Sequence, residues 1–311
     1  MSKKYPLLLK PVIKDYIWGG RKLIDDYGFE CDKDIAAEGW MLSCHPDGTN
    51  TVLNGEFKGM RFDEVLSVWG ETEKFPILIK LIDACDRLSV QVHPADEYAL
   101  KNEGEFGKTE MWYIVDCDEG AKLAYGFNRE IDKTEFERRI KDNTLDEVIN
   151  YVPVHRGDVF FISAGTLHAI GAGILIAEIQ QNSNTTYRVS DYGRLGADGK
   201  PRALHVEKAL DVTETVPPRH PFGNIGEKRE LDFGTLRPLA DCEYFKTYAL
   251  SLERECEMKA VSFLSILVLS GELNISYDGG VIAAKRGDSV YVPQGLIIKT
   301  EGKAEIIVSE K

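Results

Sequence analysis

A repeated segment constrains the fold of this chain more than any other feature of its sequence. Residues 155–171, HRGDVFFISAGTLHAIG, align with residues 285–301, KRGDSVYVPQGLIIKTE, at an offset of 130 residues. Each copy holds Arg-Gly-Asp, a short run of β-forming residues, and a glycine seven positions after the aspartate. A Gly-Asp pair ahead of an apolar run is typical of a turn between strands. The chain is therefore expected to contain two related β units.

Each copy also follows an apolar run with a glycine turn, MWYIVDCDEGAKLAYG (111–126) in the first and FLSILVLSGELNISYDGG (263–280) in the second. This arrangement resembles the two strand motifs of a cupin, a double-sheet jelly roll. We expect a mainly β fold of two cupin-type jelly-roll barrels with a helical insertion. Residues 1–230 are expected to form a metal-binding catalytic domain, and residues 231–311 a cupin-like barrel without a metal site. Because both Arg-Gly-Asp segments fall in turns, we do not interpret them as cell-adhesion motifs.

The remaining strand and helix signals agree with this fold class. Six short runs are rich in β-branched and aromatic residues: FPILIKLIDA (75–84), RLSVQVHP (87–94), TEMWYIVD (109–116), KLAYGF (122–127), DVFFIS (158–163) and ILIAEIQQ (174–181). The helical insertion is expected around residues 131–152, where DKTEFERRIKDN and TLDEVINYV have apolar residues at helical spacing. Thr144 and Glu147 have the spacing of a capping box. A second helix is expected at LHVEKALDVTE (204–214).

Composition excludes several classes of function. The net charge of −13 argues against non-specific binding to nucleic acid, so an anionic ligand needs a local cluster of Lys and Arg. No apolar run is long enough to cross a membrane, and the first 20 residues do not have the pattern of a signal peptide. The six cysteines are scattered and form no CxxC pair. We expect a cytoplasmic protein with reduced thiols and no nucleic-acid or membrane partner.

A polar strand face ends at SVQVHP (89–94). Since strand residues alternate, Gln91 and His93 share one face, and their polar groups need partners if that face points into the barrel. The same barrel offers Glu110 on one strand and His168 near the end of another. A single buried histidine is more often a core residue than a ligand. Two imidazoles, a carboxylate and an amide oxygen together suit one Zn²⁺ per chain, although Mn²⁺, Fe²⁺ or Co²⁺ fits the same ligands. Gln91 is the weakest candidate of the four ligands, because glutamine rarely binds metals; its alternative role is to contact a ligand without binding the metal itself.

The two repeat copies differ at the predicted ligand. His168 follows Gly165 by three residues, whereas Ile298 occupies the equivalent position after Gly295 in the second copy. An isoleucine cannot bind a metal ion. The second barrel is therefore expected to be structural.

Two basic residues lie near these ligands. Lys108 shares a strand face with Glu110, so it is either a salt-bridge partner of that carboxylate or a catalytic group. The polar segment QQNSNTTYRVSDYGR (180–194) holds Arg188 and Arg194, which can bind anions bidentately. Arg188 is the stronger candidate, because it lies between Tyr187 and Val189 in a strand-like segment.

Taken in order over nearly the whole chain, these motifs resemble the short bacterial form of type I mannose-6-phosphate isomerase. The motifs are PLLLKPVIKDYIWGG, FPILIKLIDACDRLSVQVHPAD, GKTEMWYI, FFISAGTLHAIG, EIQQNSNTTYRVSDYGR and ALHVEKALDV. The resemblance implies a zinc enzyme that interconverts mannose 6-phosphate and fructose 6-phosphate. It places the zinc ligands on Gln91, His93, Glu110 and His168, and catalytic or substrate-binding groups on Lys108, Arg188 and Trp18. Two positions depart from the family pattern: Gly39 stands where serine is usual, and Ser190 replaces a common aromatic residue.

Aldose–ketose isomerisation moves a proton between C2 and C1 through a cis-enediol. Lys108 is either the base or a phosphate anchor, since an ordinary lysine titrates too high to act as a base unless its surroundings lower its pKa. Arg188 is expected to hold negative charge on the enediolate or the phosphate. Two rival functions are a degenerate cupin that senses a sugar phosphate without turnover and an Fe²⁺ dioxygenase. The dioxygenase site usually carries three histidines, and the first motif here supplies one.

Overall fold

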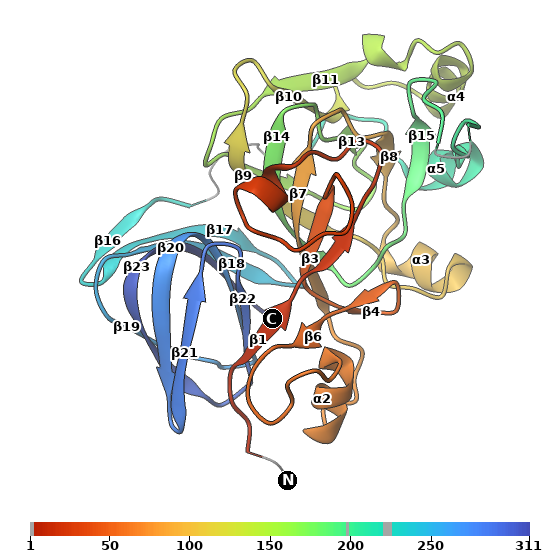
Figure 1. The fold of residues 1–311 in the computed structure, drawn as a ribbon. Coiled ribbons are helices and arrows are strands. Elements are labelled where there is room, and N and C mark those ends of the chain that lie inside the picture. The colour runs from red at the N-terminus through yellow and green to blue at the C-terminus, as the bar shows by residue number, and fades with distance from the viewer. Residues whose placement is uncertain (1–2, 197–198, 220–225) are drawn as a thin grey trace.

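The computed structural model describes residues 3–196, 199–219 and 226–311, and its mainly β fold confirms the predicted fold class (Figure 1). Both Arg-Gly-Asp segments form the same turn. Asp158 Oδ2 accepts a hydrogen bond from His155 N at 2.8 Å, and Asp288 Oδ2 accepts one from Lys285 N at 2.8 Å. The repeat therefore reflects a shared turn geometry in two barrels.

The first barrel is built from two antiparallel sheets. One has the order β12-β9-β14-β7-β3-β2 and the other β11-β10-β13-β8-β15. The strands of the larger sheet are β2 (Val12–Lys14), β3 (Glu38–Leu42), β7 (Ile77–Ala84), β9 (Glu110–Cys117), β12 (Val159–Ile162) and β14 (Ile174–Gln181). Those of the smaller sheet are β8 (Val90–Val92), β10 (Lys122–Phe127), β11 (Ile149–Pro153), β13 (His168–Ala169) and β15 (Tyr187–Ser190). All six apolar runs singled out in the sequence are strands. A short hairpin of β4 (Cys44–His45) and β5 (Gly48–Thr49) lies beside them.

The second barrel, blue in Figure 1, holds the remaining strands. They are β16 (Arg229–Leu231), β17 (Gly234–Asp241), β18 (Lys246–Leu252), β19 (Cys256–Lys259), β20 (Leu264–Tyr277), β21 (Gly280–Lys285), β22 (Ser289–Val292) and β23 (Ile297–Glu310), joined by β1 (Leu7–Lys10) and β6 (Thr51–Val52). The N-terminal strand β1 pairs antiparallel with β22, with Leu8 opposite Val290. The chain therefore begins in the second barrel with β1 and passes into the larger sheet of the first barrel with β2. The predicted division near residue 230 stays a prediction.

Separate apolar clusters fill the two barrels and the space between them. Strands β7 and β14 are buried along their whole length, because one face lines the first barrel and the other packs toward the second. This two-sided burial explains why both strands are nearly continuous apolar runs rather than alternating ones. Within them, Lys80 and Glu178 are charged residues in an apolar setting. Both charged side chains lie in the buried interior, where each needs a partner of opposite charge.

Five helices and one 3₁₀ turn are present in the described residues. They are α1 (Lys22–Asp25), α2 (Phe62–Val68), α3 (Asp96–Asn102), α4 (Lys133–Lys141), the 3₁₀ turn Leu145–Glu147 and α5 (Val206–Val212). Helices α4 and α5 confirm two of the predicted helical segments, and they cover the outer side of the smaller sheet through a shared apolar cluster. The sequence interpretation missed α1, α2 and α3. None of these helices is long and apolar enough to span a bilayer.

The prediction of a helix over TLDEVINYV is wrong. Only Leu145–Glu147 form a 3₁₀ turn, and Ile149–Pro153 form strand β11. Ile149 and Val152 pair with Phe127 and Leu123 of β10, so their β-branched side chains serve a sheet. The predicted capping box is also absent, because the Thr144 hydroxyl is buried without a hydrogen-bond partner.

Candidate metal centre

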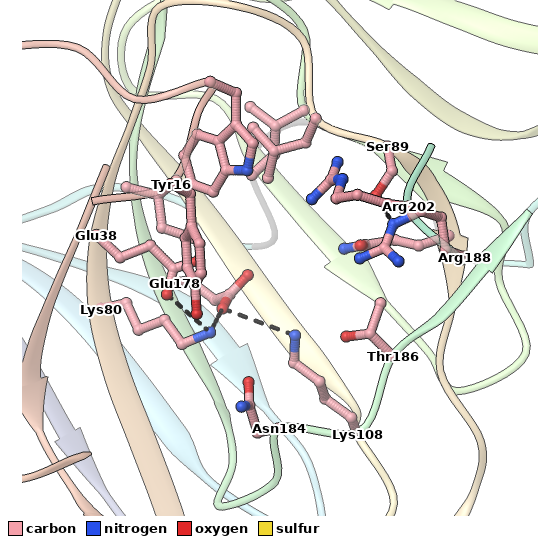
Figure 2. A pocket seen from close by; sticks show the side chains of 15 residues that line it. Tyr16, Glu38, Lys80, Ser89, Lys108, Glu178, Asn184, Thr186, Arg188 and Arg202 are labelled. Atoms are coloured by element: carbon pink, nitrogen blue, oxygen red, sulfur yellow. Dashed lines mark hydrogen bonds and ion pairs between the residues drawn. The ribbon is translucent and has the colours of Figure 1, made fainter. Parts of the chain in front are cut away.

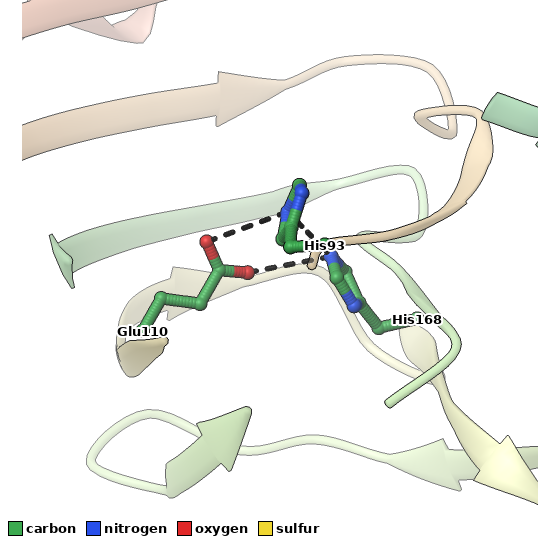
Figure 3. A group of neighbouring side chains, drawn as sticks. All are labelled: His93, Glu110 and His168. Atoms are coloured by element: carbon green, nitrogen blue, oxygen red, sulfur yellow. Dashed lines mark hydrogen bonds and ion pairs between the residues drawn. The ribbon is translucent and has the colours of Figure 1, made fainter. Parts of the chain in front are cut away.

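Three side chains that can bind a metal converge inside the first barrel (Figure 3). His93 follows β8, Glu110 begins β9 and His168 begins β13. The Nε2 atoms of the two histidines are 3.1 Å apart. Glu110 Oε2 lies 3.7 Å from His93 Nε2, and Oε1 lies 3.3 Å from His168 Nε2. Among the residues that the structure describes, no other group of three such side chains comes as close together.

Backbone carbonyls fix the orientation of both rings. His93 Nδ1 lies 2.9 Å from the carbonyl oxygen of Thr185, and His168 Nδ1 lies 2.9 Å from that of Thr166. Since a carbonyl oxygen only accepts, each Nδ1 carries the proton and donates it. Each Nε2 therefore presents a lone pair toward Glu110. Carbonyl acceptors behind metal-bound histidines are the usual way to set the tautomer and the ring plane.

These contacts fit a bound cation. His93, Glu110 and His168 are almost completely buried; Glu110 Oε1 has no hydrogen-bond partner among the described residues, whereas Oε2 lies 2.8 Å from Lys108 Nζ. Burial lowers the pKa of His168 to about 4 and that of His93 well below its usual value. The lone pairs of two neutral imidazoles then point at each other and at Glu110 Oε1, and the single Lys108 ammonium group, 3.2 Å from His93 Nε2, does not satisfy all three groups. A divalent ion with two nitrogen ligands and one oxygen ligand satisfies all three groups.

Lys108 and Gln91 border the three ligands. Lys108 is buried, with its Nζ 2.8 Å from Glu110 Oε2 and 3.2 Å from His93 Nε2. Gln91 is cross-strand from His168, and its Nε2 lies 3.4 Å from His168 Nε2. A half-turn of the amide would exchange its nitrogen for the oxygen that a metal requires. The structure thus brings all four predicted ligands and the predicted lysine to one place.

A row of charged residues that the sequence interpretation missed leads away from the metal group. Lys80 Nζ lies 3.1 Å from Glu178 Oε1 and 3.7 Å from Glu38 Oε2, and Lys108 Nζ lies 3.8 Å from Glu178 Oε1. Trp112 Nε1 donates to Glu178 Oε2 at 2.9 Å. Although burial alone would raise it, Lys108 and Lys80 hold the pKa of Glu178 at about 2. The signal in the sequence was charge inside apolar runs, Lys80 and Asp83 in the first and Glu178 in the second.

The charge of this interior also favours a cation. Glu38, Glu110 and Glu178 carry three negative charges when ionised, and Lys80 and Lys108 carry two positive charges. With all five groups ionised the net charge is −1, buried where water cannot screen it, so a nearby cation is needed to keep Glu110 ionised. Burial and then the neighbouring Glu178 raise the pKa of Glu110. A divalent ion would reverse the sign of the interior to +1, which suits an anionic ligand.

A cavity of about 280 Å³ opens beside the metal group and contains the predicted substrate-binding residues (Figure 2). Gln91 and Lys108 line its inner end, and Trp18 forms part of another wall together with the half-exposed Tyr16. Arg188 lies on the opposite side from Lys80 and Glu178. The cavity therefore connects the metal ligands' neighbours with the predicted arginine.

Arginines make that side of the cavity positive. Arg188 donates from Nη1 to the carbonyl oxygen of Ala203 at 2.9 Å, and Arg202 also lines the cavity. Asp191 accepts from both Arg202, at 2.7 and 2.6 Å, and Arg194, at 2.7 Å. Burial and the neighbouring Arg202 lower the pKa of Arg188. The Asp191 carboxylate thus forms hydrogen bonds with Arg194 and Arg202, and its charge also acts on Arg188. Arg194, proposed above as an anion ligand, is occupied by Asp191 and Asp86, while Arg202 was missed.

The equivalent place in the second barrel is apolar. Ile298, which corresponds to His168, is fully buried in the cluster that fills this barrel. Its strand neighbours include Met258 and Tyr277. An apolar side chain closes the position that carries a metal-binding histidine in the first barrel.

Comparison with known proteins agrees with this geometry. Residues 7–120 match the family described as phosphomannose isomerase type I, catalytic domain, and residues 236–311 match the mannose-6-phosphate isomerase cupin domain. The chain is 41% identical to mannose-6-phosphate isomerase ManA of Bacillus subtilis, with 98% of each chain covered. It is 36% identical to mannose-6-phosphate isomerase of Streptococcus mutans, again with 98% of each covered.

A solved structure shows the same architecture. The crystal structure of mannose 6-phosphate isomerase from Bacillus subtilis aligns with a TM-score of 0.91 at 36% identity, covering 99% of this chain and 100% of that one. Both this structural alignment and the sequence matches extend over the two barrels. The chain therefore belongs to the type I mannose-6-phosphate isomerase family.

Proposed function

We propose that this chain interconverts mannose 6-phosphate and fructose 6-phosphate with one Zn²⁺ held by His93, Glu110, His168 and Gln91. The observation that carries the proposal is the cavity that joins the neighbours of the ligand group to a cluster of arginines. Two imidazoles and a carboxylate are ligands that suit zinc with an open position. When bound, the ion would polarise the oxygens at C1 and C2 of the sugar.

The arginine side of the cavity is suited to the phosphate. Arg188 presents a permanently charged guanidinium group to the cavity, and Arg202 adds positive charge beside it although Asp191 holds two of its N–H groups. A phosphate held there directs the sugar toward Lys108 at the inner end. Trp18 would then pack along the sugar and exclude water from it. The protein is thus proposed to bind its substrate by the anionic end and to react at the other.

We assign proton transfer to Lys108. Its Nζ lies 3.2 Å from His93 Nε2 and would take the C2 proton as the neutral amine and return it to C1 as the ammonium, while Glu178 nearby stays ionised and is a weak base because its pKa is about 2. Glu178 and Lys80 would instead hold the position and charge of Lys108. Arg188, bound to the phosphate, would keep the sugar oriented as the C2 proton leaves.

Turnover by purified protein tests this proposal. Mannose 6-phosphate should be consumed in a coupled assay that detects fructose 6-phosphate, and elemental analysis should find one zinc per chain. Chelation should abolish the activity, and added Zn²⁺ should restore it. Binding of mannose 6-phosphate without turnover would instead identify a sugar-phosphate sensor. Iron as the resident metal with oxygen uptake would identify a dioxygenase.

A further inference from the structure

The loop of residues 182–186, between β14 and β15, supplies the acceptor that orients His93. The carbonyl oxygen of Thr185 lies 2.9 Å from His93 Nδ1. If this carbonyl moved, the imidazole would lose the partner that sets its tautomer and ring plane. The same loop lines the cavity through Asn184 and Thr186. What holds this loop therefore bears directly on the metal site.

Glu105 holds the loop with a single carboxylate oxygen. Its Oε2 lies 3.4 Å from Ser183 Oγ, 3.2 Å from Asn184 N and 3.1 Å from Thr185 Oγ1. All three groups can donate hydrogen bonds to this oxygen, and hydrogen bonds to an ionised acceptor are stronger than neutral ones. Glu105 precedes β9, so it belongs to a segment remote in sequence from the loop. It neither lines the cavity nor contacts His93.

A buried histidine outside the predicted site occupies the other oxygen of Glu105. His45 Nε2 lies 3.2 Å from Glu105 Oε1. His45 Nδ1 accepts a hydrogen bond from Asp47 N at 3.1 Å, so the ring proton must be on Nε2, which donates to Glu105. The hairpin of β4 and β5 thereby fixes the carboxylate, which in turn fixes the loop.

We propose that Glu105, oriented by His45, is a positioning residue for the metal site. The path runs from the imidazole of His45 through the carboxylate of Glu105 to Thr185, whose carbonyl orients His93. The inference rests on the metal binding in the proposed function, but it concerns residues that this function does not use. It commits Glu105 to acting on metal affinity and ligand geometry without touching the metal or the substrate.

Two substitutions at one position test the path. In Glu105→Ala all four contacts are lost. In Glu105→Gln the amide oxygen can still accept from the loop, but the amide nitrogen would face the N–H of His45, so only that contact is lost. Metal-free protein is loaded with Co²⁺, and the dissociation constant is measured by competition with a chelator alongside the visible absorption spectrum of the bound ion. Because substitutions behind metal ligands typically weaken binding about 10- to 100-fold, we expect Glu105→Ala to lie in this range with a changed spectrum.

Glu105→Gln should lie between Glu105→Ala and the unsubstituted protein, and His45→Ala should match it, since both break the same contact. Glu71→Ala is the matched control. Glu71 is a partly exposed carboxylate that also accepts from two partners, Lys4 and Tyr291, and it lies far from the metal group beside the second barrel. It should lower Tm without changing Co²⁺ affinity or spectrum.

The outcomes separate this inference from the proposed function. Glu105→Ala and Glu105→Gln with unchanged Co²⁺ affinity and spectrum, even with a lower Tm, would overturn the positioning role. A protein that binds no Co²⁺ would overturn it as well. A protein that binds Co²⁺ with the expected Glu105 effects, yet does not convert mannose 6-phosphate, would support the positioning role and contradict the proposed function.

Discussion

The two barrels share a turn and differ in their interiors. The Arg-Gly-Asp turns of both have the same hydrogen bond from the backbone to the aspartate. Three positions after the following glycine, the first barrel has His168 among polar groups, and the second has Ile298 among apolar side chains. The turn therefore determines how the strands are joined, and a few inward-facing side chains determine whether the barrel can bind a metal ion.

The same contrast extends across the sheets. In the first barrel, Trp112, Glu178 and Lys80 are successive cross-strand neighbours, so an ionic row crosses the sheet toward the metal group. In the second barrel, Thr247 and Ser309 are cross-strand neighbours whose hydroxyls lie 3.2 Å apart. Hydroxyls can satisfy each other without charge. The sheet beside the metal group thus holds buried ion pairs, whereas this buried polar pair of the second barrel is neutral.

The largest effect is expected at the position where the repeats differ. His168→Ala should leave a folded, metal-poor protein without detectable turnover, because it removes a ligand while the apolar clusters remain. His93→Ala should behave in the same way. Ile298→Ala should instead lower the free energy of unfolding by about 2–5 kcal/mol and keep both metal and turnover. Elemental analysis, the coupled assay and urea unfolding make the comparison. Full zinc and activity in His168→Ala would contradict the assignment of the metal to the first barrel.

Arg188→Ala is expected to have the next largest effect. Loss of a charged group that anchors the phosphate and so positions the reacting carbons costs on the order of 10²-fold in kcat/KM. Arg188→Lys should restore little, since lysine lacks the planar fork. Arg237→Ala is a matched control, because Arg237 is also partly buried and donates to a backbone carbonyl, that of Gly157, on the seam between the barrels. Steady-state kinetics that showed equal losses in the two variants would count against a special role for Arg188.

Lys108→Met separates chemistry from binding. If Lys108 transfers the proton, kcat should fall by roughly 10²-fold with a small change in KM. If it mainly holds phosphate, KM should rise, and the loss should be smaller with unphosphorylated mannose as substrate. Zinc content measured on the same samples is the control. Unchanged kinetics with normal zinc would place the proton-transfer group elsewhere in the cavity.

Much of this arrangement could be predicted from the sequence, because it depends on local patterns. Alternation in SVQVHP placed Gln91 and His93 on one face, and the repeat identified the turn and the exchange of His168 for Ile298. Helices α1, α2 and α3 were missed because four to seven residues provide at most two turns of periodicity. In TLDEVINYV, the apolar spacing fits both a helix and a strand, and pairing with β10 decides between them.

Long-range contacts could not be predicted from one sequence. Nothing near Glu105 indicates that its partners are at positions 183–185, because this proximity depends on how β9 and β14 pair. Arg202 likewise reaches the cavity from a segment without a recognisable pattern. Lys80 and Glu178 did leave a signal, since a charge within an apolar run of a large sheet requires a buried partner.

Lowering the pH should reduce the free energy of unfolding through the ionic contacts of Glu178 but not through the neutral pair Thr247 and Ser309. The pKa of Glu178 is about 2 in the folded protein and 4.5 in an unperturbed chain, so its stabilising effect is complete above pH 4.5 and declines as the pH falls toward 2. Over this window, one additional proton bound by the unfolded chain contributes a slope of about 1.4 kcal/mol per pH unit. Urea unfolding at several pH values should show this slope in the unsubstituted protein and in Thr247→Val, but a shallower one in Glu178→Gln. Parallel curves for all three would mean that Glu178 is not held ionised by its lysines.

The smallest effect is expected where the two repeats agree. The arginine of each turn reaches the other half of the molecule: Arg156 pairs with Glu305 at 2.7 Å, and the guanidinium carbon of Arg286 lies 4.5 Å from the centroid of the Tyr27 ring. Both side chains of the first pair are about half exposed or more, and such pairs contribute less than about 1 kcal/mol. In the second contact the Tyr27 ring is buried but Arg286 is exposed, and a cation–π contact with a solvated cation contributes about 0.5–1 kcal/mol.

Arg156→Ala and Arg286→Ala should therefore each lower the free energy of unfolding by at most about 1 kcal/mol, and the double variant should show their sum, because the two contacts share no residue. Zinc content and turnover should not change in any of the three. Glycine at positions 157 and 287 is the stricter requirement, since φ is 87° and 88° there, and alanine in either place should cost more than loss of the neighbouring arginine. A fall in metal affinity on substitution of Arg156 but not of Arg286 would show that the first turn supports the site beyond joining two strands, and that the two repeats differ in their turns as well as in their interiors.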